Sequence, residues 1–135
     1  MGGRVVHFEL PFDDGDRARS FYQEAFGWTA TDVPGMDYSL VMTGPTPPDG
    51  PPTEPGFING GMMARASSLG GAPTVVIDVE SIDDTLATVE RLGGSTVQGR
   101  LPVGDMGFTA YFRDTEGTVV GLWENAPSTG TSGSA

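Results

Sequence analysis

Residues 7–27 read HFELPFDDGDRARSFYQEAFG, and residues 74–94, at a constant offset of 67 positions, read TVVIDVESIDDTLATVERLGG. The two stretches align without a gap. The matched pairs share apolar character or the chemistry of a helix boundary: Phe8 with Val75, Leu10 with Ile77, Phe12 with Val79, Asp16 with Asp83, Tyr22 with Val89, Gly27 with Gly94. Self-similarity at a fixed period indicates two copies of one supersecondary unit. We therefore expect two related modules, with a natural pocket between them.

Hydrophobic periodicity predicts the same elements in each copy. The expected strands are residues 4–10, 28–33, 38–43 and 57–63, then 74–79, 95–100, 107–113 and 118–124. One amphipathic helix follows Asp13, Asp14 and Asp16 and ends at Gly27, and the other begins after Ser81 and ends at Gly93 and Gly94. Each half thus reads βαβββ, which predicts an α+β domain over residues 1–125. Its parts are module 1 (4–63), a linker (64–73) and module 2 (74–124).

Two segments lie outside this pattern. Residues 44–56 hold six prolines, so they cannot form a central strand or a helix. They form either a lid over a site or a tolerated insertion. Residues 126–135 (APSTGTSGSA) have the composition of a disordered tail.

Composition excludes several classes of function. The net charge of −11 argues against binding to nucleic acid or to anionic membranes, because proteins that bind them need clustered cationic side chains. The chain has no cysteine, which excludes disulfides and thiolate chemistry, and no lysine, which excludes a Schiff base. No apolar run is long enough to span a bilayer and no leader opens the chain, so we expect a soluble cytoplasmic protein.

Five motifs occur in order along the chain: HFELPFDD, RARSFYQEAFGW, INGGMM, VESIDDTLATVERLGG and AYFRDTEGTVVGLWE. Together they resemble the glyoxalase / bleomycin-resistance / extradiol-dioxygenase superfamily, also called vicinal oxygen chelate proteins, and in particular its small glyoxalase-like bacterial members. The resemblance covers residues 4–125. It implies paired βαβββ modules whose mixed sheets curl into an open cup, with the helices outside.

The resemblance also implies four metal-ligand positions, on the first and last strand of each module. These positions hold His7, Thr74, Met63 and Glu124. Only His7 and Glu124 are good ligands for a divalent metal, whereas catalytic metal sites normally have at least three protein ligands. We therefore expect no tightly bound cofactor. A divalent metal held by His7 and Glu124, with Glu9 and water, stays an open alternative.

The same two residues suggest acid/base catalysis without a metal, because a histidine beside a carboxylate can move protons near neutral pH. We expect His7 and Glu124 to be catalytic, and Glu9, Asn59, Met63, Thr74, Tyr111 and Trp28 to line the pocket. Alternation from Glu124 directs Trp123 away from the cup, toward a helix. The expected substrate is a carbonyl or oxygenated metabolite that is isomerised, epimerised, cyclised or cleaved.

Two other functions stay open. One is sequestration of a drug or metabolite without chemistry, because aromatic residues such as Tyr38, Phe57 and Phe108, with a strong negative charge, suit a flat or cationic ligand. The other is a metal-dependent glyoxalase-like lyase or dioxygenase. In each case the partner is a small molecule, and we expect a homodimer because open sheets expose edges that a partner normally covers.

Overall fold

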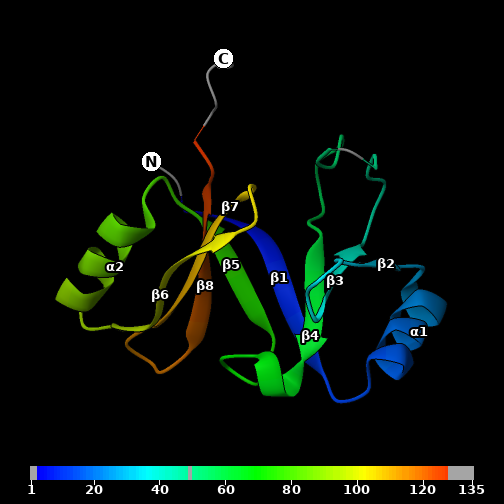
Figure 1. The fold of residues 1–135 in the computed structure, drawn as a ribbon, viewed down its shortest axis with the longest axis horizontal. Helices are drawn as coiled ribbons and strands as arrows, with labels where there is room; N and C mark the ends of the chain where they lie inside the picture. The colour runs from blue at the N-terminus through cyan, green and yellow to red at the C-terminus, as the bar shows by residue number, and fades with distance from the viewer. Residues whose placement is uncertain (1–2, 49, 128–135) are drawn as a thin grey trace. The chain divides into compact units, whose positions relative to one another are not determined.

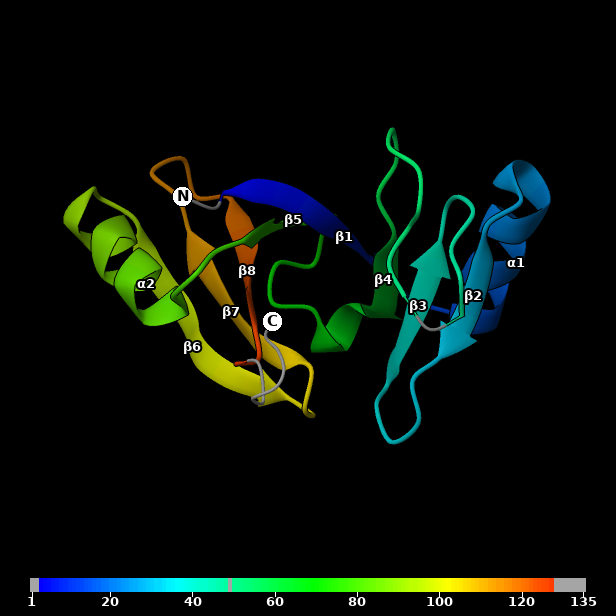
Figure 2. The same ribbon diagram turned by 90° about the horizontal axis from the view of Figure 1, so that it is seen from above.

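The computed structural model describes residues 3–48 and 50–127 (Figures 1 and 2). The chain forms two compact units. The first unit is residues 5–75, and the described part of the second unit is residues 76–127 with residues 3 and 4. The C-terminal tail predicted over residues 126–135 lies mostly outside the described residues.

The first unit contains a four-stranded mixed sheet and one α-helix in its described residues. The elements are β1 (Arg4–Phe12), α1 (Gly15–Phe26), β2 (Thr29–Asp32), β3 (Tyr38–Met42), β4 (Gly60–Ala64) and the short 3₁₀ helix η1 (Arg65–Ser67). The strand order is β2-β3-β4-β1, with β1 and β4 parallel and the other pairs antiparallel.

The second unit repeats this arrangement. Its elements are β5 (Thr74–Asp78), α2 (Ile82–Arg91), β6 (Ser95–Val103), β7 (Gly107–Arg113) and β8 (Val119–Asn125). The strand order is β5-β8-β7-β6, with β5 and β8 parallel. The predicted α+β class and the βαβββ order of both copies are confirmed.

The helix boundaries follow from the polar residues and glycines that the sequence places there. The Asp14 side chain accepts a hydrogen bond from Arg17 N, and the Ser81 side chain accepts one from Asp84 N, so each helix has a side-chain N-cap. Gly27 ends α1 in the left-handed conformation, with φ of 77°.

A strand presents alternate side chains to opposite sides, so each sheet has a helix face and, opposite its helix, a distal face. In the first unit Phe8 lies on the helix face, within 5.8 Å of the Trp28 ring, which in turn stacks on Tyr22 of α1 at 4.9 Å. In the second unit the helix face carries the core. Ile82 and Leu86 of α2 pack there with Ala110 and Leu122.

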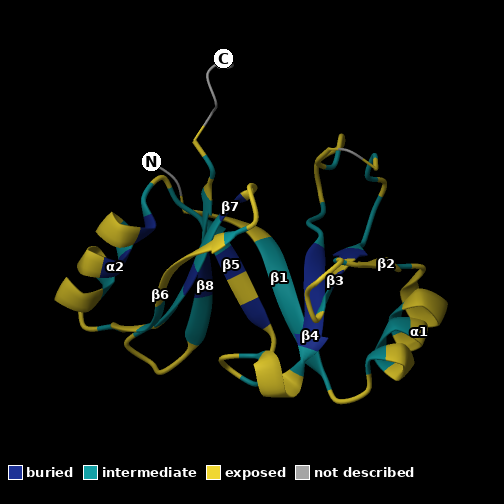
Figure 3. Ribbon diagram, in the orientation of Figure 1, coloured by how far each residue is buried: buried dark blue, intermediate teal, exposed yellow. Residues whose placement is uncertain are grey.

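The two helices differ in burial. α2 buries Ile82 and Leu86, whereas no residue of α1 is buried, as Figure 3 shows by colour. Phe21 is 59% exposed and Phe26 is 64% exposed. α1 therefore buries less of its own surface than α2 does, although Val41 and Met62 on the strands of the first unit are each only 1% exposed.

Glu124 lies on the helix face of the second unit, because it belongs to β8 two positions beyond the core residue Leu122. Its Oε1 accepts a hydrogen bond from Ile82 N at the start of α2, at 2.8 Å. Arg100 of β6 donates to both carboxylate oxygens, from Nε at 3.3 Å and Nη2 at 3.0 Å. The expectation that Trp123 points toward a helix is therefore wrong: Glu124 faces the helix, and Trp123 is on the distal face.

Arg100 is itself supported by an aromatic ring. Its guanidinium carbon lies 3.5 Å from the centroid of Phe108, the residue that pairs with Glu124 across β7 and β8. Irregular pairing of β6 with β7 on both sides of Gln98 accompanies this placement. The Arg100 hydrogen bonds, followed by the Ile82 N–H, lower the pKa of Glu124 from its ordinary value of 4.5.

The proline-rich segment joins β3 to β4. In its described residues it forms neither helix nor strand, as predicted. Asn59 anchors it: the side chain accepts from Thr43 N at 2.9 Å and donates to Thr46 Oγ1 at 2.8 Å. Among the described residues, neither helix has the length and apolar character that crossing a membrane requires.

We expect Glu124→Gln to destabilise the second unit, because glutamine keeps the shape but loses the charge bound by Arg100 and the α2 N-terminus. The free energy of unfolding, measured by urea denaturation at pH 7, should fall by about 1–2 kcal/mol. The matched control is Glu54→Gln in the exposed proline-rich segment, which should change it by less than about 0.5 kcal/mol.

The difference in free energy of unfolding between the wild type and Glu124→Gln should also depend on pH. A lowered carboxyl pKa stabilises the fold above the pKa of the unfolded chain, and that stabilisation is lost as the pH falls through the lowered value. The unfolding curves of the wild type and of Glu124→Gln should therefore converge in acid. A difference that keeps its neutral-pH size below the lowered pKa contradicts the role assigned to Glu124.

Candidate functional site

The distal face of the first-unit sheet gathers the polar groups that are best suited to chemistry. The strand registers pair Glu9 with Gly61, Leu40 with Gly61, and Tyr38 with Met63, so these side chains share one face. His7 joins them because it lies two residues before Glu9 on β1. The predicted shared face of His7 and Glu9 is thus confirmed.

Tyr38 links His7 to Glu9. The Tyr38 hydroxyl lies 2.8 Å from His7 Nε2 and donates a hydrogen bond to Glu9 Oε2 at 3.0 Å. Because the phenol gives its single proton to Glu9, it accepts from His7, and Nε2 therefore carries the imidazole proton. The three side chains form one hydrogen-bonded row: imidazole N–H to phenol oxygen, and phenol O–H to carboxylate.

His7 is neutral at physiological pH. Burial lowers its pKa from 6.5 to about 4, because the charged imidazolium loses solvation there. Its ring is nearly parallel to that of Tyr38, with an interplanar angle of 12° and ring centroids 6.5 Å apart. At neutral pH His7 is therefore a hydrogen-bond donor through Nε2 with a lone pair at Nδ1, and it is not a cation.

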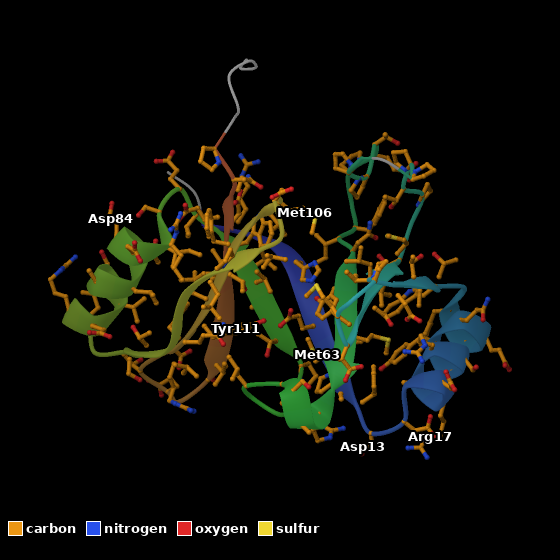
Figure 4. The ribbon with its side chains drawn as sticks, viewed as in Figure 1. Asp13, Arg17, Met63, Asp84, Met106 and Tyr111 are labelled. Carbon is orange, nitrogen blue, oxygen red and sulfur yellow. The ribbon has the colours of Figure 1, made fainter. Side chains whose placement is uncertain are left out.

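The distal face of the second-unit sheet is aromatic. Tyr111 and Trp123 lie there, on β7 and β8, and Gly121 between them is the register partner of both Tyr111 and Val76. Figure 4 labels Tyr111 on β7 and Met63 on β4. Thr74 is buried and begins the alternation that puts Val76 and Asp78 on this same face, as predicted.

Four further predicted site residues differ from one another in where their side chains lie. Met63 is 7% exposed and lies on the same face as His7. Asn59 precedes β4, and its amide holds the proline-rich segment. Trp28 packs on the helix face of the first unit, so it does not share a face with His7. Glu124 lies on the helix face of the second unit. The expectation that it occupies a ligand position equivalent to that of His7, which lies on a distal face, is therefore wrong.

The donor set does not fit a metal site with three protein ligands. Within residues 3–48 and 50–127, no three His, Cys, Asp or Glu side chains lie close enough to hold one ion. His7 Nε2 and Glu9 Oε2 are each engaged with the Tyr38 hydroxyl, and Glu124 is held by Arg100. The residues present therefore support no reaction step through a metal.

The part that sequence analysis missed is the position of Tyr38. It was expected only as one of several aromatic ligand contacts, yet it is the link between the two polar residues of β1. Its place depends on the pairing of β3 with β4, because Tyr38 lies two strands away from His7. The only local signal is the pair Gly60 and Gly61 within a strand, which often marks close approach by another group.

A family model agrees with the start of the chain. Residues 4–44 match the family model described as bleomycin resistance protein-like N-terminal. The chain is also 26% identical over 128 residues to "Putative glyoxylase CFP32" of Mycobacterium tuberculosis and of Mycobacterium bovis. The match covers 86% of this chain and 43% of the relative, so the chain spans less than half the length of these curated relatives.

Solved structures share the fold at low identity. The Streptomyces coelicolor methylmalonyl-CoA epimerase variant in complex with 2-nitronate-propionyl-CoA aligns with a TM-score of 0.64 and 15% identity, over 93% of this chain and 96% of the other. The Mycobacterium tuberculosis methylmalonyl-CoA epimerase aligns with a TM-score of 0.60 and 16% identity, over 93% and 89%. The hypothetical protein BH1468 from Bacillus halodurans gives 0.63 and 12%, over 94% and 97%. The family-model match over residues 4–44 and the glyoxylase relative indicate a resemblance to the glyoxalase / vicinal oxygen chelate superfamily, and the solved structures have the same fold.

Proposed function

We propose that this protein is a small-molecule isomerase of the epimerase or glyoxalase-like type, which moves a proton at the carbon next to a carbonyl group. The observation that carries the proposal is the row of His7, Tyr38 and Glu9 on one face of the first-unit sheet. A carboxylate base beside two neutral proton donors is the arrangement that such a proton transfer needs. The names of the structural neighbours and of the glyoxylase relative support the same class of reaction.

In the proposed reaction Glu9 takes a proton from the carbon, and the electron pair of the C–H bond moves to the carbonyl oxygen as an enolate. Glu9 then returns the proton to the same carbon after the enolate has turned its other face toward it. In a substrate with a hydroxyl group on that carbon, Glu9 instead protonates the neighbouring carbon, and the hydroxyl proton passes to the enolate oxygen. Neutral hydrogen-bond donors stabilise the enolate. Atoms and charge balance in these steps without a cofactor.

The base in this proposal is Glu9 in place of Glu124. Both oxygens of Glu124 accept hydrogen bonds from Arg100, and Oε1 also accepts from the α2 backbone, which favours its charged form and weakens it as a proton acceptor. His7 keeps the catalytic assignment that the sequence suggested. Its role changes from a charged acid/base partner of a carboxylate to a neutral donor.

Sequestration is the second candidate function. It is favoured by the match of residues 4–44 to a bleomycin resistance protein-like model and by Tyr111 and Trp123 on the second-unit distal face. Aromatic rings of this kind bind flat or cationic ligands without chemistry.

Deuterium exchange separates the two functions. We expect Glu9→Gln to reduce the rate of carbon-bound proton exchange by about 10²–10⁴-fold, while His7→Ala causes a smaller loss. The probes are methylmalonyl-CoA and a hemithioacetal of an α-oxoaldehyde, incubated in D₂O and followed by NMR. Glu54→Gln serves as the control and should exchange at the wild-type rate.

A probe that binds, by calorimetry, and returns without deuterium contradicts the isomerase proposal. In that case sequestration is the better account. Replacement of Tyr111 or Trp123 by Leu should then weaken binding, whereas Glu9→Gln should leave it nearly unchanged.

The buried His7 predicts a loss of stability in mild acid. As the pH falls from about 6.5, the unfolded chain takes up a proton on its histidine, whereas the folded chain does so only near pH 4. The contribution of neutral His7 is therefore complete above pH 6.5 and is lost over this interval. His7→Gln should lack this part of the acid loss, as measured by urea unfolding at pH 7 and pH 5.

A homodimer is expected from the first unit. All four residues of the edge strand β2 are exposed, as are Phe21 and Phe26, and such edges are usually covered. Light scattering at micromolar concentration should give twice the monomer mass. We expect Phe21→Glu to reduce that mass, whereas Ser20→Glu, at an exposed neighbouring position of α1, should not. A monomer mass for the wild type contradicts this expectation.

A further inference from the structure

The Tyr38 hydroxyl contacts His7 and Glu9 because Gly61, which lies beneath the Tyr38 ring, has no side chain. Gly61 of β4 lies between Leu40 on β3 and Glu9 on β1, which are both its register partners. A Cβ atom built on Gly61 overlaps the hydroxyl oxygen and the ring of Tyr38. The phenol therefore lies directly over the Gly61 backbone, on its way from β3 to the two polar residues of β1.

The glycine is not required by backbone conformation at this position. Gly61 has no positive φ, in contrast to Gly27 and Gly93, so an alanine can adopt its backbone angles. Glycine in a strand interior weakens the strand and usually marks close approach by another group. Here the approaching group is the Tyr38 ring.

We infer that Gly61 is a positioning residue for Tyr38, and that Tyr38 donates a hydrogen bond to the substrate oxygen in the reaction proposed above. The inference rests on that proposed function for its catalytic part. Its structural part concerns only His7, Glu9, Tyr38 and Gly61.

The chemistry follows from the direction of the hydrogen bonds. While Glu9 is charged, the Tyr38 O–H points to it, and His7 Nε2–H points to the Tyr38 oxygen. Once Glu9 has taken the substrate proton, its own O–H becomes a donor and the phenol oxygen becomes its acceptor. The Tyr38 O–H then turns toward another acceptor, and the new negative charge is on the enolate oxygen.

His7 serves this switch by staying neutral. A neutral imidazole donates one hydrogen bond to the phenol oxygen and leaves the phenol O–H able to point to Glu9 or to turn away from it. The reorientation moves no heavy atom. It needs only that the phenol oxygen stay within hydrogen-bond distance of both neighbours, which is the position that Gly61 permits.

The structural part can be tested without any substrate. The chain has a single histidine, so every imidazole NMR signal belongs to His7. We expect the Nε2–H proton of the wild type to exchange slowly with water. Tyr38→Phe and Gly61→Ala should each speed this exchange at least about tenfold, because the first removes the phenol oxygen that accepts the hydrogen bond and the second displaces it. Gly99→Ala, in a strand position with open space around it, is the matched glycine control and should keep the wild-type rate.

The catalytic part is tested by combining the two substitutions. Tyr38→Phe should slow deuterium exchange into the probe by about 10²–10³-fold, as loss of a donor to a developing oxyanion does. Gly61→Ala should cost a similar factor alone but almost nothing in a Tyr38→Phe background, because residues that act through one another are not additive. A purely structural effect of Gly61→Ala would instead multiply with that of Tyr38→Phe.

The outcomes separate the two ideas. Unchanged Nε2–H exchange in folded Gly61→Ala and Tyr38→Phe overturns the positioning role. Altered Nε2–H exchange in a protein whose wild type never deuterates the probes leaves the positioning intact and overturns the catalytic part together with the proposed function. Multiplicative losses in the double variant also overturn the inference.

Discussion

In each unit of this protein, the alternation of side chains along a strand separates the residues that pack under the helix from those on the opposite face of the sheet. A helix that covers one face of a sheet can contact only every second side chain of each strand, and the alternate side chains are left for other uses. In the second unit this puts Leu122 and Glu124 under α2 and leaves Gly121 and Trp123 on the distal face. In the first unit it puts Phe8 toward α1 and leaves His7 and Glu9 together. The proposed chemistry depends on which side of this division a residue falls.

The two copies of the repeat differ in how far the helix is buried and in which face of the sheet carries the carboxylate. Both units bury residues on their strands, but only in the second unit does the helix bury residues of its own, Ile82 and Leu86, and there Glu124 completes the start of the helix. In the first unit α1 buries nothing fully, and the carboxylate that matters is on the other side of the sheet. In the second unit the Glu124 carboxylate thus holds the start of a helix, whereas in the first unit the Glu9 carboxylate lies on the face of the proposed site. This division agrees with the low identity between the copies, since only apolar pattern and helix boundaries had to be kept.

Much of the fold could be predicted because its signals are local. The strand at 107–113 and the helix stop at Gly27 depend on neighbours within a few residues. The site could be predicted only in part. His7 and Glu9 share a face by simple alternation, but the face of Glu124 was inferred from an implied equivalence, and Leu122 in the core shows that the equivalence is shifted. The link through Tyr38 could not be predicted, because it requires the register of three strands and the absence of a side chain at Gly61.

The partners of each carboxylate matter in this protein, because the chain is strongly acidic. With a charge of −11, most carboxylates of this protein must be solvated or paired, and the Glu124 carboxylate is paired with Arg100. Glu9 instead meets a phenol and, behind it, an imidazole that burial keeps neutral. A cation beside a carboxylate favours its charged form and so weakens it as a base, whereas the phenol of Tyr38 holds Glu9 through a hydrogen bond from a neutral group. Glu124, bound by the arginine, thus secures the start of the helix, whereas Glu9, bound by the tyrosine, is the carboxylate to which we assign the proton transfer.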